Sequence, residues 1–234
     1  MRRRRMTLVL TLIAMGVAWF VYSQPGVPAA APEPAPAAKP ALADDDASAR
    51  SPAMDALNAL PVKGKAPKTG YARTQFGSGW ATAGGCDTRN VILQRDLTNI
   101  VVSDDCKVMS GTLDDPYTGK VIAFTRGVDT SADVQIDHVV ALSNAWQTGA
   151  QQLTPERRTA LANDPLELIA VDGGANQQKS DGDAATWLPA NKAFRCQYIA
   201  RQIAVKTKYN LYVTAPEKAA MQRILTACPA QLLP

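Results

Sequence analysis

Residues 134–146, VQIDHVVALSNAW, contain the only histidine of this 234-residue chain, His138, directly after Asp137. A neutral imidazole can accept a proton near pH 7, because the ordinary pKa of histidine is about 6.5. A carboxylate oxygen is a ligand that hard divalent cations prefer. A lone histidine in a strand is more often a packed core residue, but the carboxylate directly before it favours a role for His138 in a reaction.

A second group of polar residues follows a later apolar run. Residues 167–171, ELIAV, are typical of a buried strand, and a Gly-Gly pair then precedes Asn176 and Lys179. Strand, turn, strand and helix form a frame that can bring Asp137, His138 and the start of the following helix together. Lys179 either places a positive charge near a phosphate or is a solvated helix lysine.

The elements that must position these residues follow from apolar periodicity and turn residues. We expect strands at 134–142 and 167–171 and a helix opening at about residue 175, which together form one compact frame. Further elements are expected as a helix at 86–97, two strands within 106–125 joined by the turn Asp-Asp-Pro-Tyr-Thr-Gly, and helices at 154–163, 191–209 and 214–228.

The motifs resemble those of the HNH endonucleases. Asp137-His138, Leu168, Asn176 and Lys179 match the spacing of the HNH pattern. The longer run of GCDTRN, SGTLDDPYTGK, QIDHVVALSNAW and ANDPLELIAVDGGANQQKSDGDAATWLP resembles the exported HNH-type proteins related to the GmrSD carboxy-terminal domain. This resemblance covers essentially the whole chain from Tyr71 onward.

The resemblance implies a single α+β domain around a ββα-metal core, with a preceding β-hairpin and two C-terminal helices. It implies hydrolysis of phosphodiester bonds in DNA, or in RNA, with little sequence preference. His138 would be the general base, and Glu167 and Lys179 would complete the catalytic set. Asp137 and Asn176 would bind a divalent cation, Mg²⁺ in the first place, with Mn²⁺ and Zn²⁺ as alternatives.

One position departs from the family pattern, because Glu167 stands where the family has an asparagine. An amide both donates and accepts hydrogen bonds, whereas an ionised carboxylate only accepts. If the asparagine acts through its backbone or as a tether, Glu167 is tolerated, with Asn163 as a nearby substitute. If its donor is essential, the orientation of the histidine is in doubt.

Charge gives a weaker indication of the partner. The net charge is +4, but residues 71–234 hold 16 Lys+Arg and 16 Asp+Glu, so the domain itself is neutral. Helical spacing places a basic stripe on one face of the predicted helix 191–209, formed by Lys192, Arg195, Gln202 and Lys206. This stripe is either a track for a nucleic-acid backbone or a solvated face of the helix. Arg89 either binds phosphate or pairs with a nearby aspartate.

The aromatic residues have two readings as well. Tryptophans such as Trp80, Trp146 and Trp187 most often pack in the core or in a lid over a site. The alternative is that one of them stacks on a nucleic-acid base.

The N-terminal region predicts where the chain works. Residues 1–22 combine four arginines with an apolar run, which indicates a signal peptide or a retained membrane anchor. Residues 23–70 are rich in Ala and Pro and predict a disordered linker, so residues 71–234 form the domain. The chain should therefore be secreted or anchored on the outer face of the membrane, and we expect a monomer.

Four cysteines in an exported chain favour two disulfides over metal ligation. Four cysteines allow three connectivities, of which we favour the sequential pairs Cys86–Cys106 and Cys196–Cys228. Two other functions stay open: a surface binding module that keeps the HNH frame with weak or no catalysis, and a metal-dependent hydrolase of another extracellular phosphodiester.

Overall fold

Two antiparallel strands and a helix form the centre of the computed structural model, which describes residues 52–234. Strand β6 (Val134–His138) pairs with β7 (Leu168–Asp172), so that His138 lies opposite Leu168. Helix α5 (Gly173–Lys179) follows β7 directly, and its N-cap Asp172 accepts a hydrogen bond from Ala175 N. This order confirms the predicted strand, turn, strand and helix, although β6 ends at His138 and not at residue 142.

The junction between β7 and α5 requires a glycine. A Cβ atom on Gly173 would lie 2.0 Å from the carbonyl oxygen of Ala132, which is closer than any real contact. The first residue of α5 therefore packs directly against the loop that leads into β6.

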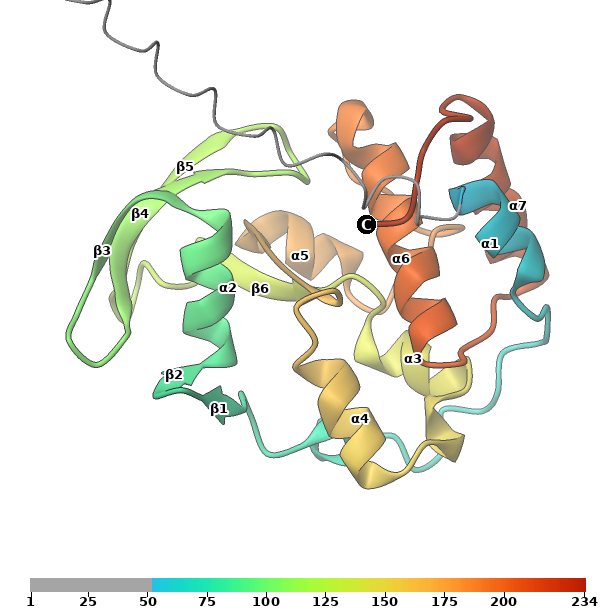
Figure 1. Ribbon diagram of the computed structural model, residues 1–234, viewed down its shortest axis with the longest axis horizontal. Coiled ribbons are helices and arrows are strands. Elements are labelled where there is room, and N and C mark those ends of the chain that lie inside the picture. The colour runs from blue at the N-terminus through green and yellow to red at the C-terminus, as the bar shows by residue number, and fades with distance from the viewer. Residues whose placement is uncertain (1–51) are drawn as a thin grey trace, which may run out of the picture. The chain divides into compact units, whose positions relative to one another are not determined.

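The remaining elements lie on either side of this centre, and the described region is α+β. The helices are α1 (Ala53–Ala59), α2 (Thr88–Asp96), α3 (Leu142–Gln147), α4 (Pro155–Ala162), α6 (Arg195–Lys208) and α7 (Ala215–Thr226), with short 3-10 helices η1 (Arg73–Phe76), η2 (Ala150–Gln152) and η3 (Lys192–Phe194). The other strands are β1 (Thr82–Ala83), β2 (Cys86–Asp87), β3 (Thr98–Val102), β4 (Val108–Asp114) and β5 (Val121–Thr125). Figure 1 shows β3, β4 and β5 at one end and α1, α6 and α7 at the other.

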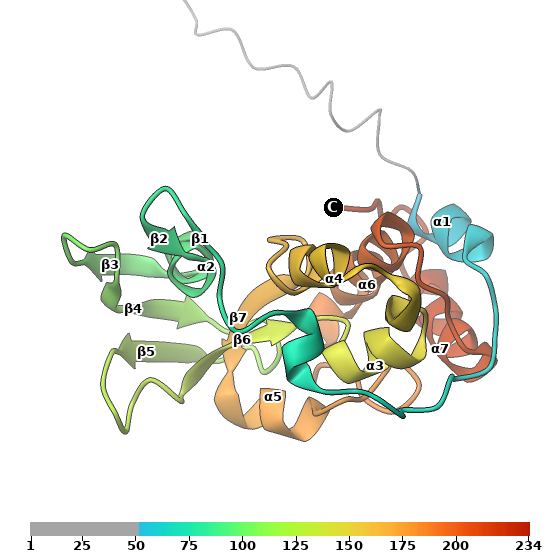
Figure 2. The ribbon, with the colours of Figure 1, turned by 90° about the horizontal axis from the view of Figure 1, so that it is seen from below.

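The predicted pair of strands within 106–125 belongs to a three-stranded antiparallel sheet in the order β3-β4-β5. The turn between β4 and β5 is closed by Asp115, whose carboxylate accepts hydrogen bonds from Tyr117 N and Thr118 N. Gly119 in the same turn has φ +77°, a conformation that favours glycine. Figure 2 shows this sheet extending from the body beside α2. All five residues of β3 are exposed and show no alternation, which explains why the sequence did not predict this strand.

Side-chain caps close the starts of three helices. Asp87 accepts from Asn90 N at the start of α2, and Thr154 accepts from Arg157 N ahead of Pro155 at the start of α4. Helix α7 begins with a capping box, in which Thr214 and Glu217 each bond the other's main chain. These local bonds satisfy amide groups that have no partner within the helix.

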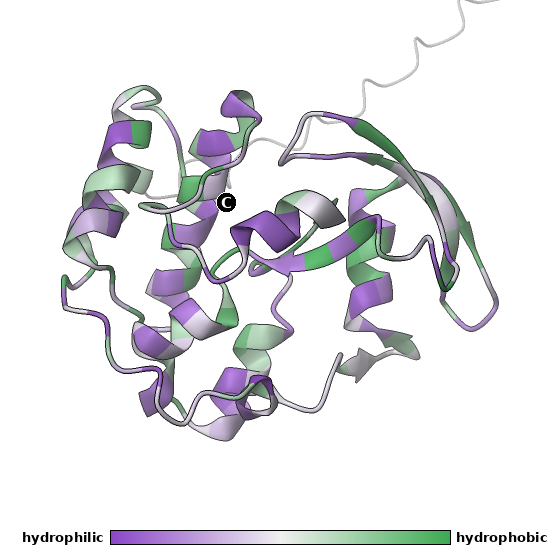
Figure 3. Cartoon of the chain, turned by 180° about the vertical axis from the view of Figure 1, so that it is seen from behind, coloured by the Kyte–Doolittle hydropathy of each residue, from purple (hydrophilic) through white to green (hydrophobic). Residues whose placement is uncertain are grey.

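The apolar core has two parts. The larger cluster surrounds α6, whose buried residues include Tyr198, Ile199 and Ile203, and it receives side chains from α1, α3 and α7. The smaller cluster lies between α2 and the strands, around Leu93 and Phe124. In Figure 3 hydrophobic and hydrophilic residues alternate along the helices, as expected where one face is buried.

The molecule has one disulfide at each end of the described region. Cys86–Cys106 connects β2 to the loop after β3, and Cys196–Cys228 connects α6 to the end of α7. The Cα atoms of the two pairs are 5.5 and 6.4 Å apart, within the usual range for a disulfide. Both predicted pairs are confirmed.

The folded region begins earlier than the boundary predicted at residue 71. Helix α1 packs against α6 and α7, and Leu57 is fully buried in the large cluster. The linker prediction for residues 23–70 is therefore wrong from residue 53 onward. The few apolar residues of α1 are enough to fix this helix against α6 and α7.

The rest of that linker and the predicted signal peptide or anchor at 1–22 lie outside the described residues. Among residues 52–234, no helix is both long enough and apolar enough to span a bilayer.

Candidate active site

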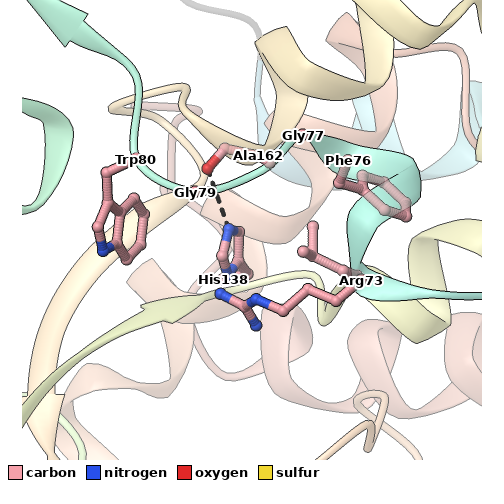
Figure 4. A pocket seen from close by; sticks show the side chains of 8 residues that line it. Arg73, Phe76, Gly77, Gly79, Trp80, His138 and Ala162 are labelled. Atoms are coloured by element: carbon pink, nitrogen blue, oxygen red, sulfur yellow. Dashed lines mark hydrogen bonds between the residues drawn. The ribbon is translucent and has the colours of Figure 1, made fainter.

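His138 ends strand β6, and its ring lies between two cavities. Its Nε2 atom is 3.0 Å from the carbonyl oxygen of Ala162 (Figure 4). A carbonyl oxygen only accepts hydrogen bonds, so Nε2 carries the hydrogen. In the neutral ring the lone pair then resides on Nδ1, and this atom is the one that can accept a proton.

The surroundings of His138 keep the ring neutral and oriented. Burial lowers the pKa of His138 to about 3; the bond to Ala162 acts in the opposite direction, and the positive charges of Arg73 and Lys179 add to the lowering. The ring of Trp80 stacks nearly parallel to the imidazole, with the ring centres 5.9 Å apart. His138 is therefore an oriented neutral base at neutral pH.

Asp137 is bound by two buried partners. Lys179 Nζ lies 3.0 Å from Oδ1 and 2.9 Å from Oδ2 of this carboxylate, and it also donates to the main-chain oxygen of His138 at 2.8 Å. Tyr117, in the turn between β4 and β5, donates its hydroxyl to Asp137 Oδ2. Burial, together with the negative charge of Asp137, raises the pKa of Tyr117 well above its ordinary value, so the hydroxyl keeps its hydrogen.

Two cavities of different character adjoin His138. The first holds about 200 Å³ and is lined by Phe76, Gly77, Gly79 and Trp80. The second holds about 350 Å³, and its lining includes Asp137 and Asn176. Arg73, His138 and Leu142 line both cavities. The arrangement places an acceptor of protons beside a polar space large enough for a phosphate group.

The structure brings together part of the predicted catalytic set. Asp137, His138 and Asn176 line one cavity, and Asn176 Nδ2 donates to Gln135 Oε1 at 2.9 Å. Lys179 is fully buried and touches Asp137 and the main chain of His138, so the prediction of a lysine that faces the phosphate or the solvent is wrong. Its position inside the α5 junction, where Asp137 needs a counter-charge, explains the difference.

Glu167 lies behind His138 and does not line either cavity. Its main-chain oxygen accepts from Val139 N at 2.9 Å, and its Oε2 accepts from Val140 N at 3.2 Å. The side chain is fully buried, and burial raises the pKa of its carboxyl group well above the ordinary value. Glu167 therefore tethers the segment that follows His138, and Asn163 caps α4 with its side chain bonded to Thr159 and Ala81.

The predicted substrate-binding residues lie away from both cavities. Lys206 is fully buried and its Nζ is 3.1 Å from Glu217 Oε1, so the predicted basic stripe is wrong at this position. Helical spacing gives the direction of a side chain on its helix, but α7 covers that face and supplies the opposite charge. Gln202, on the same predicted stripe, is buried as well.

The other predicted contacts with substrate are anchors within the fold or exposed residues. Arg195 donates to Pro189 O at 2.7 Å, and Lys192 is exposed on η3. Arg89 donates to the main-chain oxygens of Ser131 and Val134, at 3.4 and 3.2 Å, so it orders the approach to β6. Among residues 52–234 no aspartate forms an ion pair with Arg89, contrary to the alternative that the sequence left open.

Sequence reasoning missed three residues of the site: Arg73, Phe76 and Tyr117. It named Trp80 but left open whether this residue packs in the core or stacks on a base. Arg73 and Phe76 precede the histidine by more than sixty positions, and no spacing rule links them to it. Tyr117 was predicted only as part of a turn. The other two tryptophans behave as structural residues, because Trp146 packs in the large core cluster and Trp187 packs edge-on against Tyr117.

Few oxygen atoms of this cavity are left without a hydrogen-bond partner among the described residues. An ionised carboxylate has about four lone-pair positions, and Asp137 uses three of them for Tyr117 and Lys179. Asn176 Oδ1 accepts no hydrogen bond from the described residues. Two free oxygen positions suit a cation that keeps most of its waters, as Mg²⁺ does. Across residues 52–234, no cluster of three His, Cys, Asp or Glu side chains would supply more ligands.

Comparison with known proteins decides the family. Residues 87–224 match the family described as GmrSD restriction endonucleases, C-terminal domain. The chain belongs to this family. A relative from Arthroderma benhamiae, named an uncharacterized secreted protein, is 38% identical over 180 residues, which cover 76% of this chain and 85% of the relative. No solved structure matches the chain significantly.

Membership of the GmrSD carboxy-terminal family indicates a nuclease-related function. It also confirms the resemblance to the GmrSD carboxy-terminal domain that the longer run of motifs indicated. The secreted relative and the two disulfides are consistent with an extracellular location. The matched range contains β6, β7 and α5, whereas η1 and Trp80 lie before it.

Proposed function

We propose that this protein is an extracytoplasmic endonuclease of the HNH type that hydrolyses phosphodiester bonds of DNA, and of RNA to a lesser extent. One observation carries the proposal. In a member of a nuclease family, the hydrogen bond from His138 Nε2 to Ala162 leaves the lone pair on Nδ1, and His138 lines a polar cavity. A neutral imidazole can take a proton from water; the lowered pKa of His138 makes it a weak base by itself, and the negative charge of a bound phosphate would raise that pKa.

The elements around the histidine suit the ββα-metal core that the resemblance implies. Strand β6 supplies Asp137 and His138 to one cavity and helix α5 supplies Asn176, while β7 pairs with β6 and leads directly into α5. We assign the ββα-metal core to these three elements.

The residues of the site have separate roles in this proposal. His138 Nδ1 accepts the proton of the attacking water, while Ala162 and Trp80 hold the ring in place. Asp137 Oδ and Asn176 Oδ1 would hold a divalent cation. When bound, the cation would neutralise charge that develops on the phosphate and on the leaving oxygen. Lys179 and Tyr117 fix the direction of the Asp137 carboxylate.

Low sequence specificity follows from the chemistry of the cavity. Its polar lining suits the sugar-phosphate backbone, which carries no sequence information. The neutral charge of residues 71–234 predicts only moderate affinity for long nucleic acid.

One contact favours the alternative of a binding module with weak or no catalysis. Lys179 already compensates the charge of Asp137, and this pairing lowers the attraction of the carboxylate for a cation. A protein of this kind would keep the frame around His138 and bind ligands at the surface without hydrolysing them.

The two functions are separated by nicking of a supercoiled plasmid. The purified protein, with its disulfides intact, is incubated with Mg²⁺, with Mn²⁺ and with excess EDTA, and a structured RNA is run in parallel. We expect nicking with Mg²⁺ or Mn²⁺ and none with EDTA. Cleavage that persists in EDTA would remove the cation from the mechanism, and no cleavage under any condition would favour the binding module.

A further inference from the structure

Arg73 differs from most arginines of residues 52–234 in having no hydrogen-bond or ion-pair partner among these residues. Main-chain carbonyl oxygens accept hydrogen bonds from seven of these arginines: Arg89, Arg95, Arg126, Arg157, Arg158, Arg195 and Arg201. Only Arg73 and Arg223 among the described arginines donate to no described residue and form no ion pair with one, and both are exposed. The common structural use of arginine in this protein therefore does not account for Arg73.

The main chain below Arg73 is nevertheless firmly held. Phe76, at the end of η1, is 2% exposed and packs in the large core cluster. Arg158 on α4 donates from Nε to the main-chain oxygen of Gln75 at 2.8 Å, and from its other nitrogens to Gln75 Oε1 and to Leu153 O. A free guanidinium thus extends from a fixed backbone, which reduces the entropy lost when a ligand binds.

The direction of this side chain leads to the proposed base. Figure 4 shows Arg73 reaching from η1 toward the ring of His138. Arg73 lines both of the cavities that adjoin His138. A ligand that touches His138 from either cavity would therefore lie beside the guanidinium.

The charges around the cavities leave Arg73 uncompensated. Asp137 is paired with Lys179, and Asp181 is paired with Lys68 at 3.0 Å. These two pairs account for the other charged side chains at the wall of the larger cavity, so Arg73 contributes a net single positive charge there. A phosphodiester carries a single negative charge and presents two non-bridging oxygens, which match the fork of a guanidinium.

We propose that Arg73 binds the non-bridging oxygens of the scissile phosphodiester and stabilises the negative charge that grows on them when water attacks. This inference rests on the function proposed above and adds a residue that lies before the matched range of the family, 87–224. It gives Arg73 a catalytic role, while Arg158 is a positioning residue for the main chain beneath it.

The first test compares Arg73→Ala, Arg73→Lys and Arg223→Ala in plasmid nicking. Arg223 is the matched control, since it is exposed on α7 and has no described partner. We expect kcat/KM to fall by about 10²-fold or more in Arg73→Ala, as when a donor to a developing oxyanion is removed. Arg73→Lys should recover part of the loss, because it keeps the charge without the fork. Arg223→Ala should stay within about 2-fold of the wild type, as expected of a surface residue without partners.

The second test measures DNA binding with His138→Ala as the background, so that cleavage does not interfere. Adding Arg73→Ala should reduce the slope of log K against log salt concentration by about 1, which corresponds to the loss of one phosphate contact. Adding Arg223→Ala should leave this slope unchanged. If the wild type cleaves and Arg73→Ala cleaves equally well, the inference fails and the proposed nuclease stands. If the wild type never cleaves, the proposed nuclease fails, and an unchanged salt slope in Arg73→Ala would then overturn the inference as well.

Discussion

The two sides of the candidate site satisfy their polar groups in opposite ways. On the inner wall, formed by β6 and α5, Lys179 is fully buried and bonds to Asp137 and to the main chain of His138. On the outer wall, formed by residues 73–80, Arg73 is exposed and has no partner among the described residues. Protein contacts thus compensate the charge of Asp137 on one wall and leave the charge of Arg73 on the other available to a ligand.

This contrast separates residues that hold the site from residues that act in it. A buried ion pair is costly to break, because the remaining charge has no solvent to stabilise it. An exposed charge without partners contributes little to folding. Substitutions on the inner wall should therefore reduce stability first, whereas substitutions on the outer wall should reduce activity in a stable protein.

The largest effect on stability is expected from Lys179→Met. It leaves the carboxylate of Asp137 buried with only Tyr117 as a partner, and we expect a loss of about 3–5 kcal/mol in the free energy of unfolding. Urea denaturation measures it, with Lys192→Met as the control for an exposed lysine on η3. Equal stability of the two variants would show that Lys179 is not the buried counter-charge.

A smaller effect is expected from Tyr117→Phe, which removes the hydroxyl that donates to Asp137. A hydrogen bond to a charged group contributes about 1.5–3 kcal/mol. The control is Tyr212→Phe, because that hydroxyl donates to the neutral main-chain oxygen of Gln147 at 2.8 Å and should contribute only about 1 kcal/mol. If the Tyr117→Phe variant is as stable as the Tyr212→Phe variant, the negative charge of Asp137 does not strengthen the hydrogen bond from Tyr117.

The smallest effect is expected from Lys68→Ala at the mouth of the larger cavity. Lys68 and Asp181 form an ion pair in which each side chain is about half exposed, and such pairs contribute about 0–1 kcal/mol. The hydrogen bond from Lys68 lowers the pKa of Asp181, so any stabilisation is present near neutral pH and is lost as the pH falls through the titration of this carboxyl group. Urea titrations at pH 7 and pH 3 check this, and a difference that grows at pH 3 would have the wrong sign.

Much of the local structure was predictable, because short-range interactions encode it. Asp87 and Thr154 cap their helices through bonds to main-chain groups three residues ahead, and the predicted turn at Asp115 joins two strands. The disulfide pairs also followed from their positions within each end of the chain. The strand, turn, strand and helix around His138 needed only the apolar runs and the Gly-Gly pair.

The environment of each charged residue was not predictable, because distant segments determine it. Lys206 is buried because α7 brings Glu217 against α6, and no periodicity within α6 contains that information. The sequence around Lys179 likewise has the pattern of an ordinary solvated helix residue, and only the fold brings Asp137 against it. Arg73 and Trp80 reach the site by the path of the chain from η1 to β1, which follows neither a helical nor a strand pattern.

The most direct test of the central claim is the rate of plasmid nicking by His138→Ala, divided by the folded fraction and compared with the wild type at the same saturating concentration of Mg²⁺. If Nδ1 of His138 takes the proton from water, the rate should fall by about 10²-fold or more, the usual scale for a lost general base. Urea denaturation of the same sample gives the folded fraction. No second histidine exists in the chain to replace it. A variant that keeps the full specific rate would contradict the assignment of His138 as the base.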